Sequence, residues 1–327
     1  MKNIALFGDT GMVGQEIERI IEPHDQVQVA YRENSSRREG DLSSCELAFL
    51  ATKDPESMAF ARDLAKQGIR VVDMSGAFRL TKNLFEAWYG LEHTAPELLK
   101  EAVYGMPALF AEEIATASLV GSPGCYPTSV ILALKPLEGL VQGEATVVAT
   151  SGISGARREV GDEPNEVTYS FGRRHKHVPE MELYSGFRVN FTPVVLHTVF
   201  VGINSNIRIE LSDKLRGVPE DEAVSELQSA IRGTYGPDDL VAVVADRSAK
   251  LWGTADAVGT HALLIKVRVD EGFAYINALE DNLGKGAASQ GVENMNLMLG
   301  YDRLYGIDAV YRTSHGADGE DRHAEYC

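Results

Sequence analysis

The sequence predicts an α/β protein whose N-terminal part forms a doubly wound parallel sheet. Three observations predict this class. Short β-type runs alternate with helical patterns over the first 120 residues, a glycine-rich turn directly follows the first of these runs, and the pattern changes to α+β from about residue 125 onward. Because 327 residues exceed what one hydrophobic core usually serves, two domains are expected.

The N-terminal elements are read from apolar runs and helical periodicity. Strands are predicted at 4–7, 27–31, 47–51, 71–74 and 118–121. Helices are predicted between them, for example at 13–21 and at 55–67, the second with Asp54 as its N-cap and Pro55 at its first position. Strands that alternate with helices need crossover connections, so these strands are expected to be parallel.

The second half contains strand-like runs that suggest antiparallel pairing around a helix. Strands are predicted at 145–150, 187–192, 198–203 and 262–269, and a helix at 220–231. A further helix is predicted at 283–299, with Asn282 at its N-cap. We therefore expect one domain at 1–124 plus about 284–312, a second domain at 125–283, and a flexible polar tail at 313–327.

Composition narrows the class of protein. The formal net charge of −17 disfavours nonspecific attraction to nucleic acid or to an anionic membrane. Cys45, Cys125 and Cys327 are odd in number and lie far apart, so neither a disulfide framework nor a zinc site is indicated. With no long apolar run, export and membrane insertion are not expected, and a cytoplasmic location is.

A phosphate-binding turn is predicted at the end of the first strand, in the run Gly8-Asp9-Thr10-Gly11-Met12-Val13-Gly14. Glycines let a backbone approach a pyrophosphate closely, and the following helix N-terminus supplies N–H donors. The G-x-x-G-x-x-G spacing is less common than G-x-G-x-x-G. A simple tight turn between strand and helix is the alternative.

The end of the second strand indicates which cofactor fits this turn. An NAD site usually carries an acidic residue there for the ribose hydroxyls, whereas this chain reads Tyr31-Arg32-Glu33-Asn34-Ser35-Ser36-Arg37-Arg38. Arginine and serine suit a 2′-phosphate, so NADP is favoured, although Glu33 points the other way. Either Arg32 or the run 36–38 contacts the 2′-phosphate, and whichever does not is part of a solvated charged loop.

A lone thiol lies in the turn Ser122-Pro123-Gly124-Cys125-Tyr126-Pro127-Thr128, just before a helix-like apolar run at 130–134. A cysteine at a helix N-terminus meets unpaired N–H groups and the helix dipole, which lower its pKa. Cysteine can then form an acyl intermediate if a base lies nearby. The alternative is a small buried residue in a turn, so the function must be argued from the rest of the chain.

Two further groups of residues are candidates for the base and the binding residues that a nucleophilic Cys125 would need. His175-Lys176-His177-Val178-Pro179-Glu180 would place both imidazoles on one side if the segment is extended, with Glu180 available to orient one of them. Metal binding or a surface loop are the alternatives. The run 151–158, with small residues beside paired arginines, suits a nicotinamide carboxamide or a substrate phosphate; a glycine-containing loop is the alternative.

Together these motifs resemble the N-acetyl-gamma-glutamyl-phosphate reductase family, NADP-dependent enzymes of arginine biosynthesis. The likeness follows nearly the whole chain in order: the Gly8 turn, 72–80, 122–128, 151–157, 175–180, and 281–286 through 294–300. It implies a Rossmann-type NADP-binding domain and an α+β catalytic and dimerisation domain of the semialdehyde dehydrogenase type.

The resemblance implies that Cys125 attacks an acyl phosphate and forms a thioester, which NADPH reduces. His177 would be the general acid/base, supported by His175 and Glu180, without a metal. The cofactor-binding residues expected from the motifs and the resemblance are Gly8, Thr10, Gly11, Met12, Val13, Gly14, Arg32, Ser36, Arg37, Ser75, Ser154, Gly155 and Asn282. Substrate binding is assigned to Arg79, Ser151 and Arg157, and a homodimer or homotetramer is expected.

The chain also departs from the family pattern. Ser122 stands where the family usually has Asn, and Ala108 where it usually has Glu. Three alternative functions are kept: aspartate-semialdehyde dehydrogenase, a reductase of carrier-bound aminoadipyl phosphate in lysine biosynthesis, and a non-catalytic NADP-binding regulator. The His-x-His-x-x-Glu run is not the pattern of the first, and the intact Cys125, His177 and Glu180 argue against the last.

Overall fold

The computed structural model describes residues 1–155, 165–236, 239–244 and 252–307 and divides them into two compact units. One unit comprises Met1–Gly124 with 287–307, and the other comprises Cys125–Gly286. The predicted substrate residue Arg157 and the predicted tail at 313–327 lie outside the described residues.

The first unit contains a doubly wound sheet, as predicted. Its strand order is β3-β2-β1-β4-β5-β7-β6, and all neighbours are parallel except β2 and β3. The edge strands β3 and β6 were not predicted from the sequence. The bounds are β1 Lys2–Phe7, β2 Val27–Glu33, β3 Arg38–Gly40, β4 Leu47–Leu50, β5 Arg70–Asp73, β6 Ala102–Tyr104 and β7 Leu119–Gly121.

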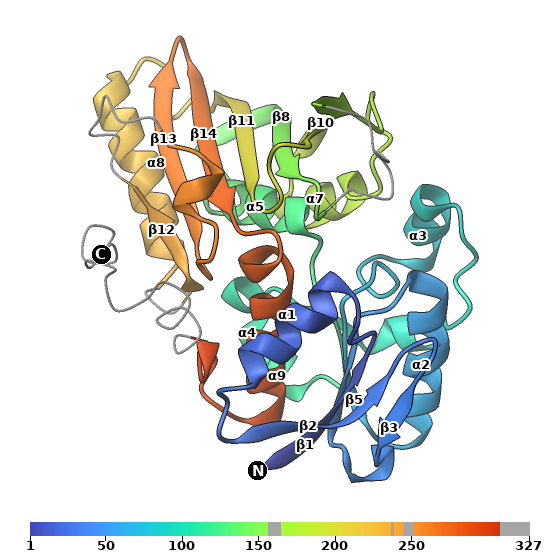
Figure 1. The fold of residues 1–327 in the computed structure, drawn as a ribbon. Coiled ribbons are helices and arrows are strands. Elements are labelled where there is room, and N and C mark those ends of the chain that lie inside the picture. Colours follow the sequence, from blue (N-terminus) through green and yellow to red (C-terminus); the bar gives the residue numbers. More distant parts are fainter. Residues whose placement is uncertain (156–164, 237–238, 245–251, 308–327) are drawn as a thin grey trace. The chain divides into compact units, whose positions relative to one another are not determined.

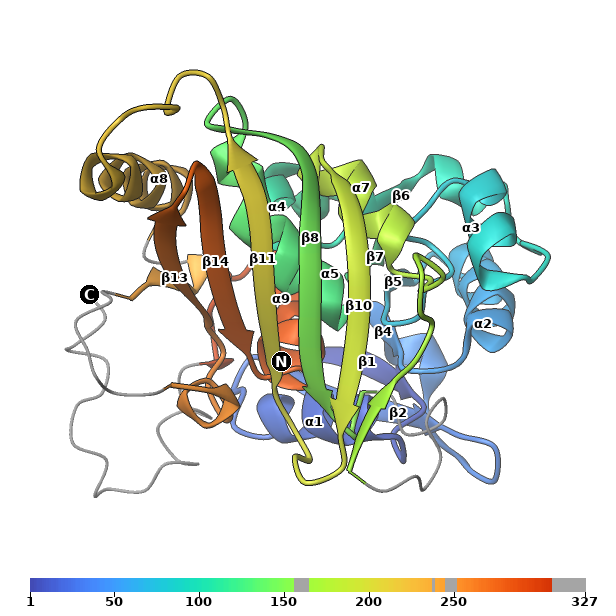
Figure 2. The ribbon, with the colours of Figure 1, turned by 90° about the horizontal axis from the view of Figure 1, so that it is seen from above.

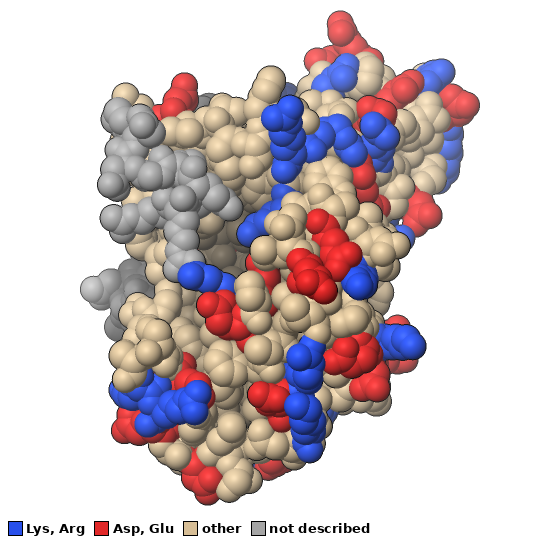
Figure 3. Space-filling model, turned by 90° about the vertical axis from the view of Figure 1, so that its right-hand side faces the viewer, with Lys and Arg blue, Asp and Glu red and all other residues tan. Residues whose placement is uncertain are grey.

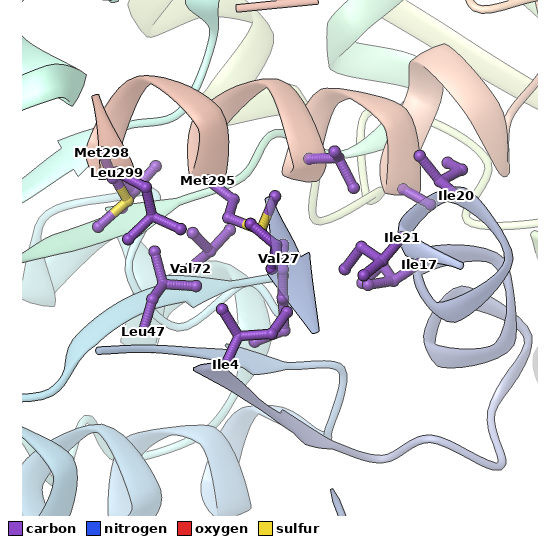
Figure 4. Close-up of a cluster of buried hydrophobic side chains, with 14 of the residues drawn as sticks. Ile4, Ile17, Ile20, Ile21, Val27, Leu47, Val72, Met295, Met298 and Leu299 are labelled. Atoms are coloured by element: carbon purple, nitrogen blue, oxygen red, sulfur yellow. The ribbon is translucent and has the colours of Figure 1, made fainter. Parts of the chain in front are cut away.

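Helices cover both faces of this sheet (Figure 1). Successive residues of β1 point to opposite faces, so Ile4 and Leu6 join one apolar core whereas Ala5 and Phe7 join another. Figure 4 shows the first core, where side chains of α1, α9 and the strands meet. The helices are α1 Met12–Ile21, α2 Asp54–Lys66, α3 Lys82–Tyr89, α4 Pro107–Thr116 and α9 Ser289–Leu299, with short 3₁₀ turns η1 Leu42–Ser44 and η2 Leu98–Lys100.

One predicted cap in this unit is wrong. Asp54 is the first residue of α2, and Lys53 occupies the N-cap position. The Asp54 carboxylate instead accepts a hydrogen bond of 2.7 Å from the Gly76 N–H, on the loop after β5. A distant backbone donor has therefore displaced local capping, which a sequence pattern does not reveal.

The second unit contains a mixed sheet with the order β12-β13-β14-β11-β8-β10-β9. The antiparallel prediction is wrong for the predicted strands β8 and β10, which pair in parallel. The predicted strand β13 is antiparallel to β14 and parallel to β12, two strands that the sequence did not predict, and β11 is antiparallel to β8 and β14. The predicted strand at 198–203 is also wrong, because this segment is a turn that leads into β11. The bounds are β8 Val141–Gly152, β9 Glu166–Thr168, β10 Arg188–Leu196, β11 Ile203–Leu211, β12 Val241–Val243, β13 Leu263–Asp270 and β14 Phe273–Glu280.

Helices lie behind one face of this second sheet, and the other face is open to the viewer in Figure 2. Along β8 the side chains of Val147 and Ala149 are buried, whereas Val148 between them is 43% exposed. Tyr275 of β14 is 40% exposed. The helices are α5 Cys125–Leu134, α7 Val178–Ser185 and α8 Glu220–Thr234, with 3₁₀ turns η3 Lys135–Leu137 and η5 Thr254–Asp256 and the π-helical turn η6 Gly284–Ala288.

Acidic and basic side chains are interspersed on the molecular face in Figure 3, so the net negative charge is not gathered there into one patch. Among the described residues, no helix is long and apolar enough to cross a membrane. The same part of the chain contains no group of three or more His, Cys, Asp or Glu side chains placed to hold a metal ion.

Candidate active site

The predicted nucleophile Cys125 is the first residue of α5. All residues of this helix after Cys125 are buried, and the Tyr235 hydroxyl donates a 2.9 Å hydrogen bond to the Leu132 carbonyl. A helix that is apolar on all sides is held firmly inside its domain. Cys125 therefore has a fixed position at a helix N-terminus while its own side chain stays only half-buried.

Cys45 has a different environment. It follows the short turn η1 in the first unit, and burial raises the pKa of its thiol. A buried thiol with a raised pKa is a poor nucleophile near neutral pH. Of the two described cysteines, Cys125 has the environment of a reactive thiol.

His175 and His177 lie together beside the start of α5. Their ring centroids are 4.7 Å apart, and the Tyr126 ring lies 5.6 Å from His175 and 6.1 Å from His177. The predicted extended segment is wrong: the two histidines lie in a turn that leads into α7, and the His177 N–H donates to His175 Nδ1 at 3.2 Å. The turn nevertheless brings both imidazoles together.

The two histidines differ in their environment. His175 is almost fully buried, and its Nε2 lies 3.3 Å from the Tyr169 hydroxyl. Burial, reinforced by the neighbouring Lys176 charge, lowers the pKa of His175 to about 3. His175 is therefore neutral at physiological pH, and its Nδ1 accepts a hydrogen bond from the His177 N–H, which supports the turn.

Glu180 lies in the first turn of α7 and is fully buried. An acidic residue at this position interacts favourably with the positive end of the helix dipole. His177 is the N-cap residue of the same helix, and the Met181 N–H donates to the His177 carbonyl at 3.0 Å. The start of α7 thus fixes the positions of His177 and Glu180 together.

Ser154, Gly155 and Asn282 form a second cluster in this unit. Asn282 Nδ2 donates to Ser154 Oγ at 2.9 Å, and its Oδ1 accepts from the Gly202 N–H at 2.7 Å. A Cβ on Gly155 would lie only 3.3 Å from Ser151 Oγ, so the chain passes close to the end of β8. The structure therefore brings these three predicted cofactor residues side by side.

Asn282 does not cap the following helix, so that prediction is wrong. The adjacent Asp281 does: its carboxylate accepts hydrogen bonds from the N–H groups of Leu283 and Gly284, each at 2.9 Å. It also accepts one from the Gly259 N–H at 2.8 Å. The predicted helix at 283–299 begins as the π-helical turn η6 and continues as α9.

The glycine turn of the first unit has the shape that a phosphate group requires. Gly8 has a positive φ of 83°, and a Cβ there would lie 2.2 Å from the Ala51 carbonyl oxygen. The N-cap of α1 is Gly11, no side chain caps it, and the first turn of α1 contains no acidic residue. Its N–H groups are therefore open to an anion, and Thr10, Gly11 and Met12 are exposed around them.

The two arginines predicted to contact the 2′-phosphate, Arg32 and Arg37, differ in their partners near the end of β2. Arg32 Nε donates to Glu18 of α1 at 2.8 Å, so its guanidinium is engaged with that helix. Arg37 pairs with Asp9 inside the glycine turn, and Ser36 is exposed beside it. The Glu33 carboxylate is buried and accepts from Tyr31 and Arg38, at 2.5 and 2.8 Å.

The remaining predicted residues support backbone turns. Ser75 Oγ donates to the buried Asp73 carboxylate at 2.8 Å, and burial raises the pKa of Asp73 to about 6. Arg79 is almost fully buried and donates to the Ser122 carbonyl at 2.6 Å. Ser151 Oγ donates to the Gly152 carbonyl at 3.0 Å. Their contact with a ligand stays a prediction.

Sequence reasoning did not select several residues that the structure places in or near the site. Tyr126 and Asp281 lie inside the sequence motifs 122–128 and 281–286, so these motifs were a signal for them. Tyr169 and Glu280 had no comparable signal, because their proximity to the site depends on strand pairing. Glu280 ends β14 and is fully buried.

Family models match most of the chain. Residues 36–117 match the model described as semialdehyde dehydrogenase, NAD binding domain. Residues 125–282 match the model described as semialdehyde dehydrogenase, dimerisation domain. The second match begins at Cys125 and ends at Asn282, so it contains both clusters of the second unit.

Curated relatives are similar over almost their entire length. N-acetyl-gamma-glutamyl-phosphate reductase of Acinetobacter baylyi is 34% identical, with 95% of this chain and 99% of the relative covered. The protein of the same name from Thermus thermophilus is 34% identical over 91% of this chain and 96% of its own. Among solved structures, aspartate semialdehyde dehydrogenase II of Vibrio cholerae has the same fold, with a TM-score of 0.70, 20% identity, and 91% and 98% of the two chains covered.

Proposed function

This chain belongs to the N-acetyl-gamma-glutamyl-phosphate reductase family of semialdehyde dehydrogenases, and on that premise we propose its reaction and the residues that perform it. The reaction is the NADPH-dependent reductive dephosphorylation of N-acetyl-gamma-glutamyl phosphate to N-acetylglutamate semialdehyde, a step of arginine biosynthesis. A thiol in this role must stay reduced, so the cytoplasm is the compartment that fits it.

One observation carries the assignment of residues. The helix that begins with Cys125 places the ring of its second residue, Tyr126, 6.1 Å from the ring of His177, the N-cap residue of α7. This neighbourhood of two helix starts supports assigning the thiol and the imidazole to one site. A nucleophile beside a proton-transfer group is the arrangement that acyl transfer requires. The 20% identity to aspartate semialdehyde dehydrogenase supports the fold alone, so the acetylated glutamyl substrate is favoured over aspartyl phosphate.

The chemistry of the protein residues follows from this arrangement. The Cys125 thiolate attacks the acyl carbon, a C–S bond forms, and the C–O bond to phosphate breaks with the electron pair leaving on phosphate. Bound NADPH supplies the hydride that reduces the resulting thioester. His177 donates a proton to the hemithioacetal oxygen that forms, and accepts it again as the C–S bond breaks and the aldehyde leaves.

NADPH fits the residues of the glycine turn and of the Ser154 cluster. The uncapped N-terminus of α1 would hold the pyrophosphate, and Thr10 to Val13 would line it. Because Glu33 is already bound by Tyr31 and Arg38, no carboxylate of that strand end would oppose a 2′-phosphate. Ser154, Gly155 and Asn282 would hold the nicotinamide end.

The overall reaction can be tested in the oxidative direction. We expect the protein to form NADPH from NADP, phosphate and N-acetylglutamate semialdehyde, followed by absorbance. Omission of phosphate should abolish the rate, because the thioester then has no acceptor. Activity with aspartate semialdehyde or with carrier-bound aminoadipate semialdehyde, but none with N-acetylglutamate semialdehyde, would overturn the proposed substrate. Inactivity with all three would favour a non-catalytic regulator.

Replacing Arg37 by Ala should weaken NADPH binding about tenfold, because one charge-assisted contact to the 2′-phosphate is lost. NADH, which lacks this phosphate, should bind the variant and the unchanged protein equally. The matched control is Arg32→Ala: both arginines are ion-paired, but Arg32 pairs with Glu18 of α1, whereas Arg37 pairs with Asp9 in the glycine turn, so the loss of Arg32 should leave the KM for NADPH nearly unchanged. The reverse pattern of KM values would assign the 2′-phosphate to Arg32.

Self-association is proposed through the open face of the second sheet, because the matched model covering it is a dimerisation domain. This face holds a recess of about 490 Å³. Its lining places Trp252 and the exposed Val148 and Tyr275 among polar residues. A second copy of the chain would bury these side chains.

A charge placed on this face should dissociate the dimer. We expect Val148→Asp to shift the sedimentation coefficient to that of the monomer at micromolar protein, because the interface would then bury an unpaired carboxylate. Leu183→Asp is the matched control, since Leu183 is 50% exposed on α7. A variant V148D that sediments like the unchanged protein would place the interface elsewhere.

A further inference from the structure

A buried carboxyl group at the end of β14 has no role in the mechanism above. Glu280 is fully buried, and within the described residues neither of its carboxyl oxygens has a hydrogen-bond partner. Buried polar groups are almost always paired, and an unpaired one is costly to keep. Such a group calls for a reason other than stability.

The position of Glu280 supplies that reason. A Cβ built on Gly286 would lie 2.8 Å from Glu280 Oε1 and also 2.9 Å from Cys125 Cβ. The carboxyl oxygen and the nucleophile therefore adjoin the same small space, and glycine at this point leaves no side chain between them. The Gly286 N–H donates to the Asp281 carbonyl at 2.9 Å, which fixes the backbone there.

Burial and two neighbouring charges set the pKa of Glu280. Burial raises the pKa of Glu280 well above its ordinary value; Lys285 opposes this shift and Asp281 adds to it. The buried Lys285 ammonium donates to the Asp239 carbonyl at 3.2 Å, so part of its hydrogen-bonding capacity is used elsewhere. The neighbouring strand β11 presents the apolar Ile203 opposite Glu280. The raised pKa favours the protonated carboxyl group, and in this form the group is a hydrogen-bond donor.

We propose that Glu280 is a further catalytic residue: its neutral carboxyl group, which has no hydrogen-bond partner among the described residues, donates a hydrogen bond to the Cys125 sulfur when the thiol ionises. This bond stabilises the thiolate before it attacks the acyl carbon and again when it leaves the hemithioacetal. The proton stays on Glu280 throughout, so no proton transfer is added to the reaction. Glu280 then acts on the sulfur while His177 acts on the substrate oxygen. The hydrogen bond to the thiolate concerns Cys125 alone, whereas its role when the hemithioacetal breaks down rests on the proposed function.

Alkylation of Cys125 by iodoacetamide tests the bond without any substrate. The rate would be measured against pH in a Cys45→Ser, Cys327→Ser background, so that Cys125 is the remaining thiol. In Glu280→Leu the midpoint of the pH profile should rise by about one unit, because the thiolate loses a donor, which slows alkylation about tenfold at neutral pH. Glu280→Gln should restore the original midpoint, since its amide can donate.

Two outcomes would overturn the proposal. A midpoint in Glu280→Leu that is unchanged or lower would show that Glu280 does not stabilise the thiolate. Equal midpoints in the Leu and Gln variants, both raised, would show that hydrogen bonding is not the mode of action. Glu280→Leu should fold, because it replaces an unpaired buried acid by an apolar side chain of similar size. Thermal midpoints of both variants check this, and inactivity of the unchanged protein would concern only the proposed function.

Discussion

Replacing Cys125 by Ser should lower kcat for N-acetylglutamate semialdehyde by about 10⁴-fold or more. A serine hydroxyl is not ionised near neutral pH and the helix N-terminus does not make it so, whereas the thiol at the start of α5 can form a covalent acyl intermediate. Initial rates of NADP reduction measure the loss. Mass spectrometry of the protein mixed with acyl phosphate in the absence of NADPH should show an acyl group on Cys125 and none in Cys125→Ser.

Cys45→Ser is the matched control for this experiment. Burial raises the pKa of the Cys45 thiol, and its sulfur lies 3.6 Å from the Asp41 carbonyl oxygen in a packed turn of the first unit. Its replacement should leave kcat unchanged within about twofold, because Cys45 is packed in its own unit and is not among the residues to which the reaction is assigned. A Cys125→Ser variant that keeps more than about one tenth of the rate would contradict a thioester mechanism.

The second large effect is expected at His177. His177→Asn should lower kcat by about 10²- to 10⁴-fold, because asparagine can hydrogen bond but cannot exchange a proton with the hemithioacetal oxygen. Acylation of Cys125 by acyl phosphate should persist in this variant, since phosphate leaves without needing that proton. The measurement is therefore a comparison of steady-state turnover with the amount of acyl-enzyme formed in a single mixing.

His175→Asn provides the comparison that separates the two imidazoles. The pKa of His175 is lowered to about 3, so its imidazole takes up a proton only in strong acid and stays neutral between about pH 5 and 9. Its replacement should reduce kcat by loosening the turn but leave the shape of the pH profile unchanged. If His175→Asn abolished the pH dependence and His177→Asn did not, the general acid/base would be His175.

The sequence was sufficient to predict those structural features that depend on residues close together in the chain. The turn and apolar run at Cys125 predict a helix that begins at the thiol, and the glycine spacing after the first strand predicts the start of α1. Both depend on residues within a few positions of each other. The doubly wound sheet followed from the alternation of strands and helices, because short crossover connections leave few topologies.

Strand pairing in the second unit could not be read in the same way. In the parallel pairing of β8 with β10, Glu144 lies opposite Arg188, and the sequence of neither strand indicates which strand it pairs with. The strand β14 was missed although its alternation and the preceding Asp270-Glu271-Gly272 turn are a hairpin signal. Without β14, the burial of Glu280 beside Cys125 was not predictable.

Capping was misread for a physical reason that recurs in both units. Asp54 and Asn282 each stand at the start of a helical pattern, yet each hydrogen bonds to a backbone N–H far along the chain. Local propensity favours a cap for both residue types, but a buried N–H from another segment offers a partner that water does not replace. Asp281, one residue earlier, takes the local role.

The hydrogen bonds of Asn282 determine how small a fragment of this protein could be and still form the Ser154 cluster. Asn282 is bonded to Gly202, 80 positions away, and to Ser154, 128 positions away. Both bonds close loops that contain most of the strands of the second sheet. No short peptide of this chain can reproduce the cluster, because each bond exists only after the intervening strands have found their partners. The Ser154 cluster is thus a property of the whole second unit, and a truncation that removes any strand between Ser154 and Asn282 removes the cluster with it.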